Sequence, residues 1–472
     1  MISPDELEEK SRQFEINVAN VQRDYVLGWL LYAIFTQTAL KDTLFLKGGN
    51  ALRKCYFPET RYSSDIDLGT PYDIDPKFLS SEIIKACGVV SSATGIQFKN
   101  EDIRIDEKFK ATNEGDRGKL KVFEVRLYFK EFYTGADHIR IKIEMDVTRF
   151  DRTILPIQSR SIFHPYSDAV QLATAVIRCA KAEEILASKL KCILQREHAP
   201  DLFDVVYPEI FAPGFELNKS EILLAFLSKT IFRPSPAVAK NILLKMPFDF
   251  FRAYWSKTIV CARAAFFDVE VAIQKFGALL DSLFAGFTEA PFSTRLFFSA
   301  ELRVPIMKAA RTQTLLKVIY KGSERVVEPY SLKYLEPRAE SAREYLFVWN
   351  RSGGSQSEPG LRMFVADNFQ SIENTEEKFD PRYEIELCKA GEPVADPLLY
   401  DPAKQPSSRA ARSWSFQKRT PRPRTRPRHA FRCTICNRLF YKTTFDGSLG
   451  EHKGKSGTRC YGRFGVFVKT TY

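Results

Sequence analysis

Three aspartates stand where paired carboxylates could hold divalent metal ions. Asp65 and Asp67 flank a single isoleucine, so in a strand both carboxylates project from the same face. Asp146 lies near the end of the alternating segment 139–147, on its polar face. Three carboxylates suit two Mg²⁺ ions about 3.5–4 Å apart, as phosphoryl transfer requires. Two aspartates alone would also fit a solvated strand edge, but the third carboxylate favours a metal site.

A pair of glycines comes shortly before these aspartates. The apolar segment 43–47 runs directly into Gly48 and Gly49. Glycines let a phosphate approach backbone N–H groups where a strand turns toward a helix. Most glycine pairs are plain turns, so this pair indicates a phosphate site only together with the aspartates that follow.

Alternating and helical segments surround these residues. Residues 19–40 predict an apolar helix before the glycine pair, and the segments 121–129 and 139–147 alternate with period two and predict a hairpin. Long stretches without glycine between 168 and about 290 predict helices, and strand-like segments return between 315 and 387. The pattern predicts a mixed α/β (α+β) protein.

Bulk properties limit the class of protein. The chain has 472 residues, of which 44% are hydrophobic, and this predicts a soluble protein of two to four domains. No apolar run reaches the roughly 18 residues of a membrane span, and the start of the chain is acidic rather than a basic, apolar signal. Nine cysteines, mostly scattered, favour free thiols in a reducing compartment. We therefore expect a cytoplasmic protein that does not contact membranes.

Positive charge is concentrated at the C-terminal end. The net charge is +12, but residues 401–472 alone hold 17 Lys or Arg and 3 Asp or Glu, a net +14, which leaves −2 for the rest of the chain. Residues 389–430 predict a disordered basic linker rich in Pro and Arg. Together with Trp414, Phe416 and Tyr441, the basic tail suits phosphate contact and base stacking. The alternative is a solvated tail that only aids solubility.

A short Cys/His segment closes the chain. Its four soft ligands are Cys433, Cys436, His452 and Cys460. Such a set in a short peptide with little apolar core is typical of a structural Zn²⁺ site. The spacing is irregular for a two-cysteine, two-histidine finger and more like a small zinc ribbon, and His429 could substitute for one ligand. Free cysteines in a flexible tail are the alternative.

Three segments resemble the successive motifs of a known family. They read "FLKGGNALR" (45–53), "RYSSDIDL" (61–68) and "AEEILASKLKCILQREHAPDLFDVVY" (182–207). In this order they resemble the AbiEii/AbiGii-type nucleotidyltransferases, toxins of bacterial toxin–antitoxin and abortive-infection (phage defence) systems, over roughly residues 15–290. The resemblance implies a DNA-polymerase-beta-like fold that transfers a nucleoside monophosphate from an NTP. For several members the acceptor is the 3′ end of tRNA.

The resemblance also implies roles for individual residues. It makes Asp65, Asp67 and Asp146 the ligands of two Mg²⁺ ions. It makes Lys189 and Asp204 catalytic, with the lysine also binding the nucleotide. The implied nucleotide-binding set is Lys47, Gly48, Gly49, Asn50, Arg53, Lys189 and Arg196.

Two positions depart from the family pattern. Asn50 stands where Ser or Thr usually follows the glycines, although its amide can still donate to phosphate. Pro200 replaces the arginine that usually precedes Asp201, and Arg196 can compensate for it.

The predicted helix at 182–197 places two cations on its apolar side. On a helical wheel, Lys189 and Arg196 share the stripe that contains Ile185, whereas Lys191 faces solvent. A buried cation needs an anionic partner, and a triphosphate or the carboxylates would serve. A structural Lys–Glu pair, or a side chain that reaches back to solvent, is the alternative.

A second resemblance covers residues 312–388. The segments "VIYKGSERVVEPYSLKY", "REYLFVWN" and "LRMFVADNFQSIENTEEKFDP" resemble in order the WYL domain, a small strand-rich module of bacterial regulators and defence proteins. This implies a pocket for a nucleic acid or nucleotide-like ligand, formed by Arg325, Tyr345 and Arg362. Glu344 replaces the usual tryptophan and Asn368 a usual arginine, and without the resemblance the segment predicts only a small β domain.

The sequence thus predicts five parts and one principal function. The parts are a nucleotidyltransferase core (1–165), a helical subdomain that completes the active site (166–300), a WYL-like domain (312–388), a basic linker (389–430) and a zinc-binding segment (431–472). The predicted function is a Mg²⁺-dependent nucleotidyltransferase toxin that modifies RNA, foremost the tRNA 3′ end, bound through the basic tail, with a cognate antitoxin as a further partner. Two alternatives are nucleotidylation of a protein, for example AMPylation of an antitoxin, and a WYL/zinc nucleic-acid-binding regulator with an inactive core.

Overall fold

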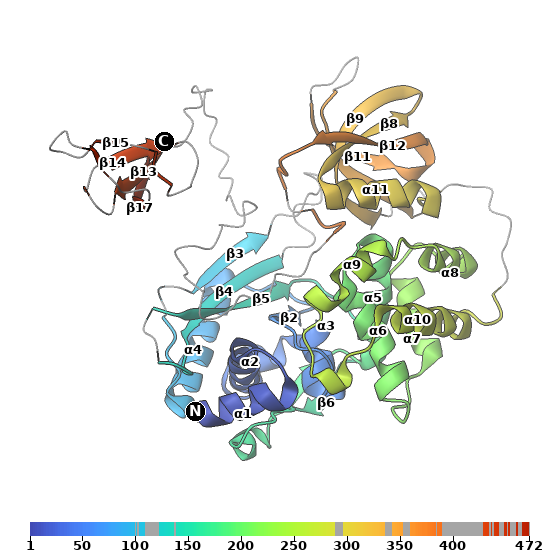
Figure 1. Cartoon of the computed structure of the whole chain (residues 1–472). Helices are drawn as coiled ribbons and strands as arrows, with labels where there is room; N and C mark the ends of the chain where they lie inside the picture. Colours follow the sequence, from blue (N-terminus) through green and yellow to red (C-terminus); the bar gives the residue numbers. More distant parts are fainter. Residues whose placement is uncertain are drawn as a thin grey trace. The chain divides into compact units, whose positions relative to one another are not determined.

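The chain forms two compact units, residues 1–410 and 411–472 (Figure 1). The computed structural model describes residues 1–99, 101, 103–108, 122–135, 138–287, 296–335, 342–352, 359–383, 385–388, 428–433, 436, 439–442, 448–450, 452–453, 459–460 and 465–471. The predicted linker at 389–430 therefore falls almost entirely outside the described residues, as do Trp414 and Phe416.

A seven-stranded mixed sheet forms the centre of the N-terminal part of the first unit, in the order β3-β4-β5-β2-β1-β7-β6. The strands are β1 (Phe45–Lys47), β2 (Asp65–Gly69), β3 (Arg104–Lys108), β4 (Val122–Lys130), β5 (Arg140–Thr148), β6 (Gln158–Ser161) and β7 (Val176–Cys179). β4 and β5 form the predicted antiparallel hairpin. β5 then pairs in parallel with β2, and β1 pairs in parallel with β7.

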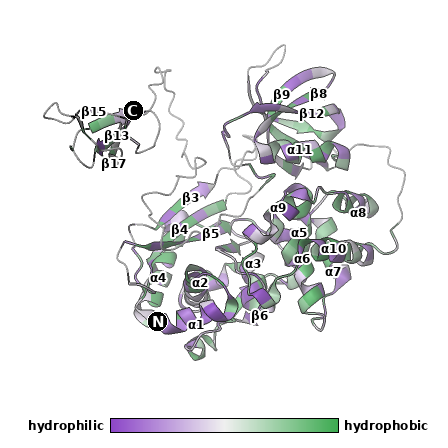
Figure 2. Cartoon of the chain, viewed as in Figure 1, coloured by the Kyte–Doolittle hydropathy of each residue, from purple (hydrophilic) through white to green (hydrophobic). Residues whose placement is uncertain are grey.

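Helices accompany this sheet. They are α1 (Pro4–Phe14), α2 (Val18–Gln37), the 3-10 helix η1 (Ala39–Asp42), the short α3 (Gly48–Ala51), the π-helix η2 (Leu52–Tyr56) and α4 (Pro76–Thr94). Of these, α2 and α3 contact the strands of the sheet directly, while α1 and α4 pack against α2. The predicted apolar helix is confirmed as α2, which Asn17 caps and whose residues are mostly buried. Because α2 is apolar on nearly all sides, it lies inside the protein, whereas α1 is largely hydrophilic (purple in Figure 2).

The middle of the chain is mainly helical, as predicted. Its helices are α5 (Ala182–Gln195), α6 (Ala199–Phe211), α7 (Lys219–Ser228), α8 (Pro236–Leu244), α9 (Asp249–Thr258) and α10 (Val269–Leu283), with short 3-10 helices η5 (Ala169–Leu172) and η6 (Arg263–Ala265). The strand β7 also falls in the range predicted to be helical. Its four residues are too few to show a period, but they extend the main sheet beside β1.

A β-rich region, residues 300–388, completes the first unit. The helix α11 (Ala300–Thr312) packs against a five-stranded antiparallel sheet in the order β11-β10-β9-β8-β12. The strands are β8 (Thr314–Tyr320), β9 (Ser323–Leu335), β10 (Arg343–Asn350), β11 (Gly360–Val365) and β12 (Phe369–Lys378), with the 3-10 helix η7 (Ala366–Asn368) between the last two. The predicted strand-rich region is thereby confirmed, and α11 is an addition.

The second unit contains short strands only, within its described residues. They are β13 (Arg428–Cys433), β14 (Leu439–Lys442), β15 (His452–Lys453), β16 (Arg459–Cys460) and β17 (Gly465–Thr471). Its core consists of Phe431, Cys433, Leu449 and Cys460. Such a small core rarely folds without a staple such as a metal ion.

Among the described helices of the whole chain, none combines the length and the apolar character that crossing a membrane requires.

Candidate active site

The strands β2 and β5 bring the predicted carboxylates together. Asp65 lies opposite Glu144 and Asp67 opposite Asp146 in the parallel pair. Alternate residues of a strand, and residues directly opposite each other, share a face. All four carboxylates therefore occupy one face of the sheet. Glu144 shares the polar face of segment 139–147 with Asp146, but it was not predicted to belong to the site, because only the strand register sets it against Asp65.

Asp65 is surrounded by negative charge. Its side chain reaches solvent, yet loss of hydration among the neighbouring protein atoms, followed by the charges of Glu144 and Asp67, raises the pKa of Asp65 to about 6. Lys142 lies 2.9 Å from Glu144 and offsets part of this charge. A hard divalent cation such as Mg²⁺ would relieve the remaining repulsion, so the donor set fits the predicted metal site.

The two glycines let the site's own side chains approach the turn. Gly48 has a φ of 69°, in the left-handed region that favours glycine. A Cβ on Gly48 would overlap the carboxylate of Asp67, and one on Gly49 would lie 2.8 Å from Nη2 of Arg61. Any larger residue would push the turn away from β2, so the glycines are needed to assemble this site. Their contact with phosphate stays a prediction.

Asn50 holds the start of β2. Its Nδ2 donates to the carbonyl oxygens of Ser63, at 3.2 Å, and Asp65, at 2.6 Å. Asn50 is fully buried, so its amide hydrogens serve the backbone that carries Asp65. This differs from the expectation that the amide donates to phosphate.

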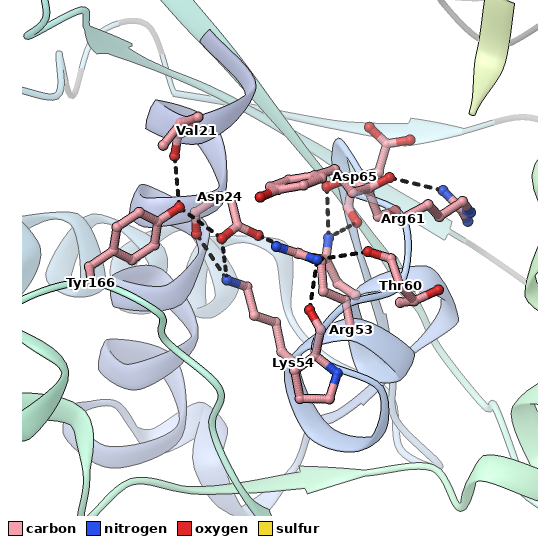
Figure 3. Close-up of polar contacts among 12 residues, drawn as sticks. Val21, Asp24, Arg53, Lys54, Thr60, Arg61, Asp65 and Tyr166 are labelled. Carbon is pink, nitrogen blue, oxygen red and sulfur yellow. Dashed lines mark hydrogen bonds and ion pairs between the residues drawn. The ribbon is translucent and has the colours of Figure 1, made fainter. Parts of the chain in front are cut away.

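Arg53 lies in a buried ionic network rather than at the carboxylate face (Figure 3). Its Nε donates to Asp24, at 2.9 Å, and its Nη1 to the carbonyl oxygens of Pro58 and Thr60, at 2.8 and 2.7 Å. The guanidinium also stacks on the ring of Tyr62 at 3.7 Å. Because Arg53 is only 3% exposed, the predicted contact with a nucleotide is wrong for this structure. Arg53 instead fixes the loop that leads to Asp65.

Asp24 is the centre of that network, and no role was predicted for it from the sequence. Nζ of Lys54 lies 2.9 Å from Asp24, and the hydroxyl of Tyr166 donates to it at 2.9 Å. Burial alone would raise the pKa of Asp24, but Arg53 and Lys54 lower it well below its usual range. An acidic residue in the middle of an otherwise apolar helix was the available signal.

Lys47 supplies a cation at the edge of the carboxylate face. It lies opposite Asp67 in the β1–β2 pair. Its Nζ donates to the hydroxyl of Thr148 at 3.0 Å and forms an ion pair with Asp151. The lysine is partly exposed, as a residue that contacts a nucleotide would need to be.

A second polar group lies between α5, α6 and the segment before β2. Lys189 is 2.9 Å from Asp201 and 3.0 Å from Asp204. Arg61 donates to both carboxylate oxygens of Asp204 at 2.7 Å, and Arg196 donates to Asp201 at 2.8 Å. Lys189 points inward, as predicted, but its partners are Asp201 and Asp204 rather than the carboxylates of the metal site or a Glu. Its contact with a triphosphate stays a prediction.

The wheel argument for Arg196 is wrong, because α5 ends at Gln195 and Arg196 has extended backbone, with φ −154° and ψ 155°. Arg196 nevertheless reaches Asp201 from the segment after the helix, which agrees with its expected compensation for Pro200.

The carboxylate face of β2 and β5 and the cation group of Lys189, Arg61 and Arg196 form one site. Burial alone would lower the pKa of Arg61 and Arg196, but Asp204 and Asp201 raise it, and weaker contributions come from Asp65 on Arg61 and Asp67 on Arg196. The arrangement thus sets a carboxylate face, suited to metal ions, beside buried and partly buried cations suited to phosphate.

The predicted zinc ligands come together in the second unit. The ligand atoms of Cys433, Cys436, His452 and Cys460 all lie within 4.8 Å of one another. Sγ of Cys433 is 3.8 Å from Sγ of Cys460, and Sγ of Cys436 is 3.4 Å from Nε2 of His452. Around a tetrahedral Zn²⁺ ion, two sulfur ligands lie about 3.8 Å apart, and a sulfur and a nitrogen ligand lie about 3.5 Å apart. The cluster is therefore compatible with zinc.

The orientation of His452 supports the same conclusion. Its Nδ1 lies 2.9 Å from the carbonyl oxygen of Gly450, so Nδ1–H donates and the lone pair of Nε2 faces the cysteines, as in zinc sites. His429, on β13, is not one of the four clustered ligands.

The three predicted WYL-type residues do not line one pocket. Arg325, Tyr345 and Arg362 lie half-buried on β9, β10 and β11. Tyr345 is opposite Val365, three residues from Arg362 on β11. Residues three apart in a strand point to opposite faces, so Tyr345 and Arg362 are separated by the sheet. Glu344 instead forms a buried ion pair with Arg303 of α11 at 2.7 Å.

Comparison with known proteins identifies the class. Residues 29–245 match the family model described as "Nucleotidyl transferase AbiEii toxin, Type IV TA system", and this range contains the carboxylate face and the cations of α5 and its C-terminal end. The protein is therefore a nucleotidyltransferase, and residues 29–245 are similar to the AbiEii toxins of type IV toxin–antitoxin systems. The family implies an NTP substrate and an antitoxin. The match ends before the β-rich region and the C-terminal segment, whose likeness to a WYL domain and a zinc ribbon stays a prediction.

Individual relatives are distant. One solved structure, MenT4, nucleotidyltransferase toxin Rv2826c from Mycobacterium tuberculosis H37Rv, shows 15% identity and a TM-score of 0.34, over 60% of this chain and 89% of that chain. No curated protein matches the chain.

Proposed function

We propose that this protein transfers a nucleoside monophosphate from an NTP to RNA, foremost to the 3′ end of tRNA, in a Mg²⁺-dependent reaction. The observation that carries the proposal is the carboxylate face of Asp65, Asp67 and Asp146 beside the partly buried cations Lys189 and Arg196.

The roles of the residues follow from their positions. Asp65, Asp67 and Asp146 would hold two Mg²⁺ ions, whose chemistry is to acidify the acceptor hydroxyl and to neutralise the departing pyrophosphate. Asp201 and Asp204 hold Lys189, Arg61 and Arg196 in fixed positions, where the cations can share the charge of the triphosphate. Gly48 keeps the turn close to Asp67.

The test is incorporation of label from each of the four NTPs into total tRNA by the purified protein. We expect label in RNA with the wild type and none with Asp67→Asn. Asp106→Asn is the matched control, because Asp106 is an exposed aspartate of β3, paired with Arg126. Equal incorporation by the wild type and Asp67→Asn would overturn the proposal. Label in protein instead of RNA would keep the transferase and change its acceptor.

RNA is proposed as acceptor because positive charge is concentrated in residues 401–472, at +14. Deleting this segment should raise KM for tRNA and leave kcat largely unchanged, since the reacting groups lie in the first unit. Binding of RNA by the intact protein should fall with salt, by a log–log slope of about −0.7 per phosphate contacted. An unchanged KM would leave the tail without a role in acceptor binding.

The regulator with an inactive core is the weaker candidate. The family match and the complete carboxylate set both argue against it. Growth arrest by the wild type that Asp67→Asn abolishes would distinguish catalysis from binding alone.

A further inference from the structure

The junction between α5 and α6, residues 195–198, contacts the proposed nucleotide site on one side and the β-rich region on the other. On the site side, Arg196 donates to Asp201 at 2.8 Å, and Nδ1 of His198 lies 3.3 Å from the same carboxylate. Asp201 in turn holds Lys189. The junction therefore carries part of the cationic half of the site.

On the other side, the β-rich region holds the junction at several points. Nε2 of Gln195 donates to the carbonyl oxygen of Leu332 on β9 at 3.0 Å. Arg311 of α11 donates to Oε2 of Glu197 at 3.0 Å. The backbone N–H of Glu197 donates to the carbonyl oxygen of Leu387 at 3.0 Å.

The backbone of the junction explains this division. Arg196 and His198 both have extended backbone. Successive side chains of an extended segment point in opposite directions. Arg196 and His198 thus face Asp201, while Glu197 between them faces Arg311. Because one rigid peptide segment carries all three side chains, a shift of Glu197 must shift Arg196.

The carboxylate of Glu197 depends mainly on Arg311. Its carboxylate is fully buried, and its Oε1 has no hydrogen-bond partner among the described residues. The charged groups that act on it are Arg311 of α11 and Asp249 of α9, and of these only Arg311 attracts it. A buried carboxylate that relies on one cation is sensitive to any movement of that cation.

We propose that the β-rich region sets the nucleotide affinity of the transferase site through this junction, with Glu197 and Arg311 as positioning residues for Arg196. A ligand or partner that displaces α11 would thereby weaken nucleotide binding without touching the carboxylate face. The inference rests on the proposed function, in which Arg196 and Lys189 take up the charge of the triphosphate.

The test compares Glu197→Gln, Arg311→Gln and the double variant in the full-length protein. The substrate is the NTP that the wild type incorporates fastest, and KM, kcat and Tm are measured for each protein. We expect each single variant to raise KM for the NTP about five- to tenfold, with kcat within about twofold. The double variant should be no worse than either single variant, because both remove the same ion pair.

Two further variants make the result specific. Arg311→Lys keeps the charge and should restore most of the affinity. Glu324→Gln removes the exposed ion pair with Lys317 in the same β-rich region and should leave KM unchanged. If Glu197→Gln does not fold, the KM values of Arg311→Gln and Arg311→Lys show whether the ion pair sets the affinity for the NTP.

The outcomes separate the two proposals. An unchanged KM in both Glu197→Gln and Arg311→Gln, with an active wild type and an inactive Asp67→Asn, would overturn the inference and keep the function. A lower kcat together with a lower Tm, and no rise in KM, would also overturn the inference, because it would mean that the ion pair only stabilises the fold. A wild type that incorporates no NTP would instead overturn the proposed function.

Discussion

The site contains two groups of acidic residues that are held in opposite ways. Asp201 and Asp204 are buried, and each lies within about 3 Å of two cations. Burial alone would raise the pKa of both, but the cations lower it. Asp65 reaches solvent, but loss of hydration, followed by the charges of Glu144 and Asp67, raises its pKa to about 6. The protein neutralises the first group itself, whereas the second is suited to receive a cation from outside.

This difference changes how Asp204 is understood. The family resemblance made it catalytic, but in the structure its two oxygens accept from Arg61, and Nζ of Lys189 lies 3.0 Å from one of them. We therefore expect Asp204 to act as a positioning residue that keeps two cations in place beside the carboxylate face. Asp65 and Asp67 are the residues expected to touch the metal ions.

The largest expected effect is the loss of activity in Asp65→Asn. We expect transfer to fall by at least about 10²–10³-fold, since a charge that acts on the reacting groups is removed. Thermal unfolding at pH 7.5 should show an equal or higher Tm, because the variant also removes repulsion among the carboxylates. A clear drop in Tm would contradict the comparison, because it would mean that Asp65 stabilises the fold.

Asp204→Asn should have the opposite effect on stability. It leaves Arg61 and Lys189 without a full counter-charge in a buried place, which costs about 3–5 kcal/mol. Chemical denaturation of the wild type, Asp204→Asn and the control Asp106→Asn measures this difference. If Asp204→Asn unfolds at the same denaturant concentration as the control, the cations do not depend on Asp204.

The pH dependence of stability should show a contribution from Glu197. Burial raises the pKa of Glu197 to about 7, from 4.5, against the opposing effect of Arg311. The folded state therefore binds a proton more tightly than the unfolded state, and this carboxyl lowers stability as pH rises from 4.5 to about 7. The slope is at most about 1.4 kcal/mol per pH unit. Glu197→Gln should remove this part of the slope, and an unchanged profile from pH 4.5 to 7 would refute it.

The Cys/His cluster extends the comparison to a second kind of metal site. We expect one equivalent of Zn²⁺ per chain by elemental analysis, and loss of the metal in Cys433→Ser, since Cys433 is a buried ligand. Cys261→Ser is the control, because Cys261 lies in the first unit and outside the cluster. Activity toward the NTP should change little, because the carboxylate face lies in the other unit. Equal zinc content in Cys433→Ser and the wild type would rule out this site.

Local patterns in the sequence predicted the carboxylates, the glycine turn and the zinc ligands, because spacing within one strand or one short segment determines each of them. Glu144 was not included, since its place beside Asp65 depends on how two strands pair. Arg53 was misassigned because only the folded structure brings Asp24 next to it. Pro200 could have predicted the end of α5. Proline is typical of the first turn of a new helix, here α6, and it excludes a continuous helix through the junction.

The helix α11 illustrates the same limit. Pro305 interrupts its sequence pattern, and its place becomes clear only when it covers the five-stranded sheet. Likewise β7 was missed because its short sequence carries no periodic signal, while its pairing with β1 comes from a distant part of the chain.

The order of the strands also decides when the protein can become active during its own synthesis. β1 lies between β2 and β7, and Leu46 pairs with Cys179, which follows it by 133 residues. The cations of α5 and their partners on α6 are made later still. A ribosome adds roughly 5–20 residues per second, so on the order of ten seconds separate the synthesis of Asp67 from that of Asp204. A nascent chain thus carries two of its carboxylates well before it can assemble a working site, and we expect the enzyme to stay inactive until at least the first half of its first unit has been translated.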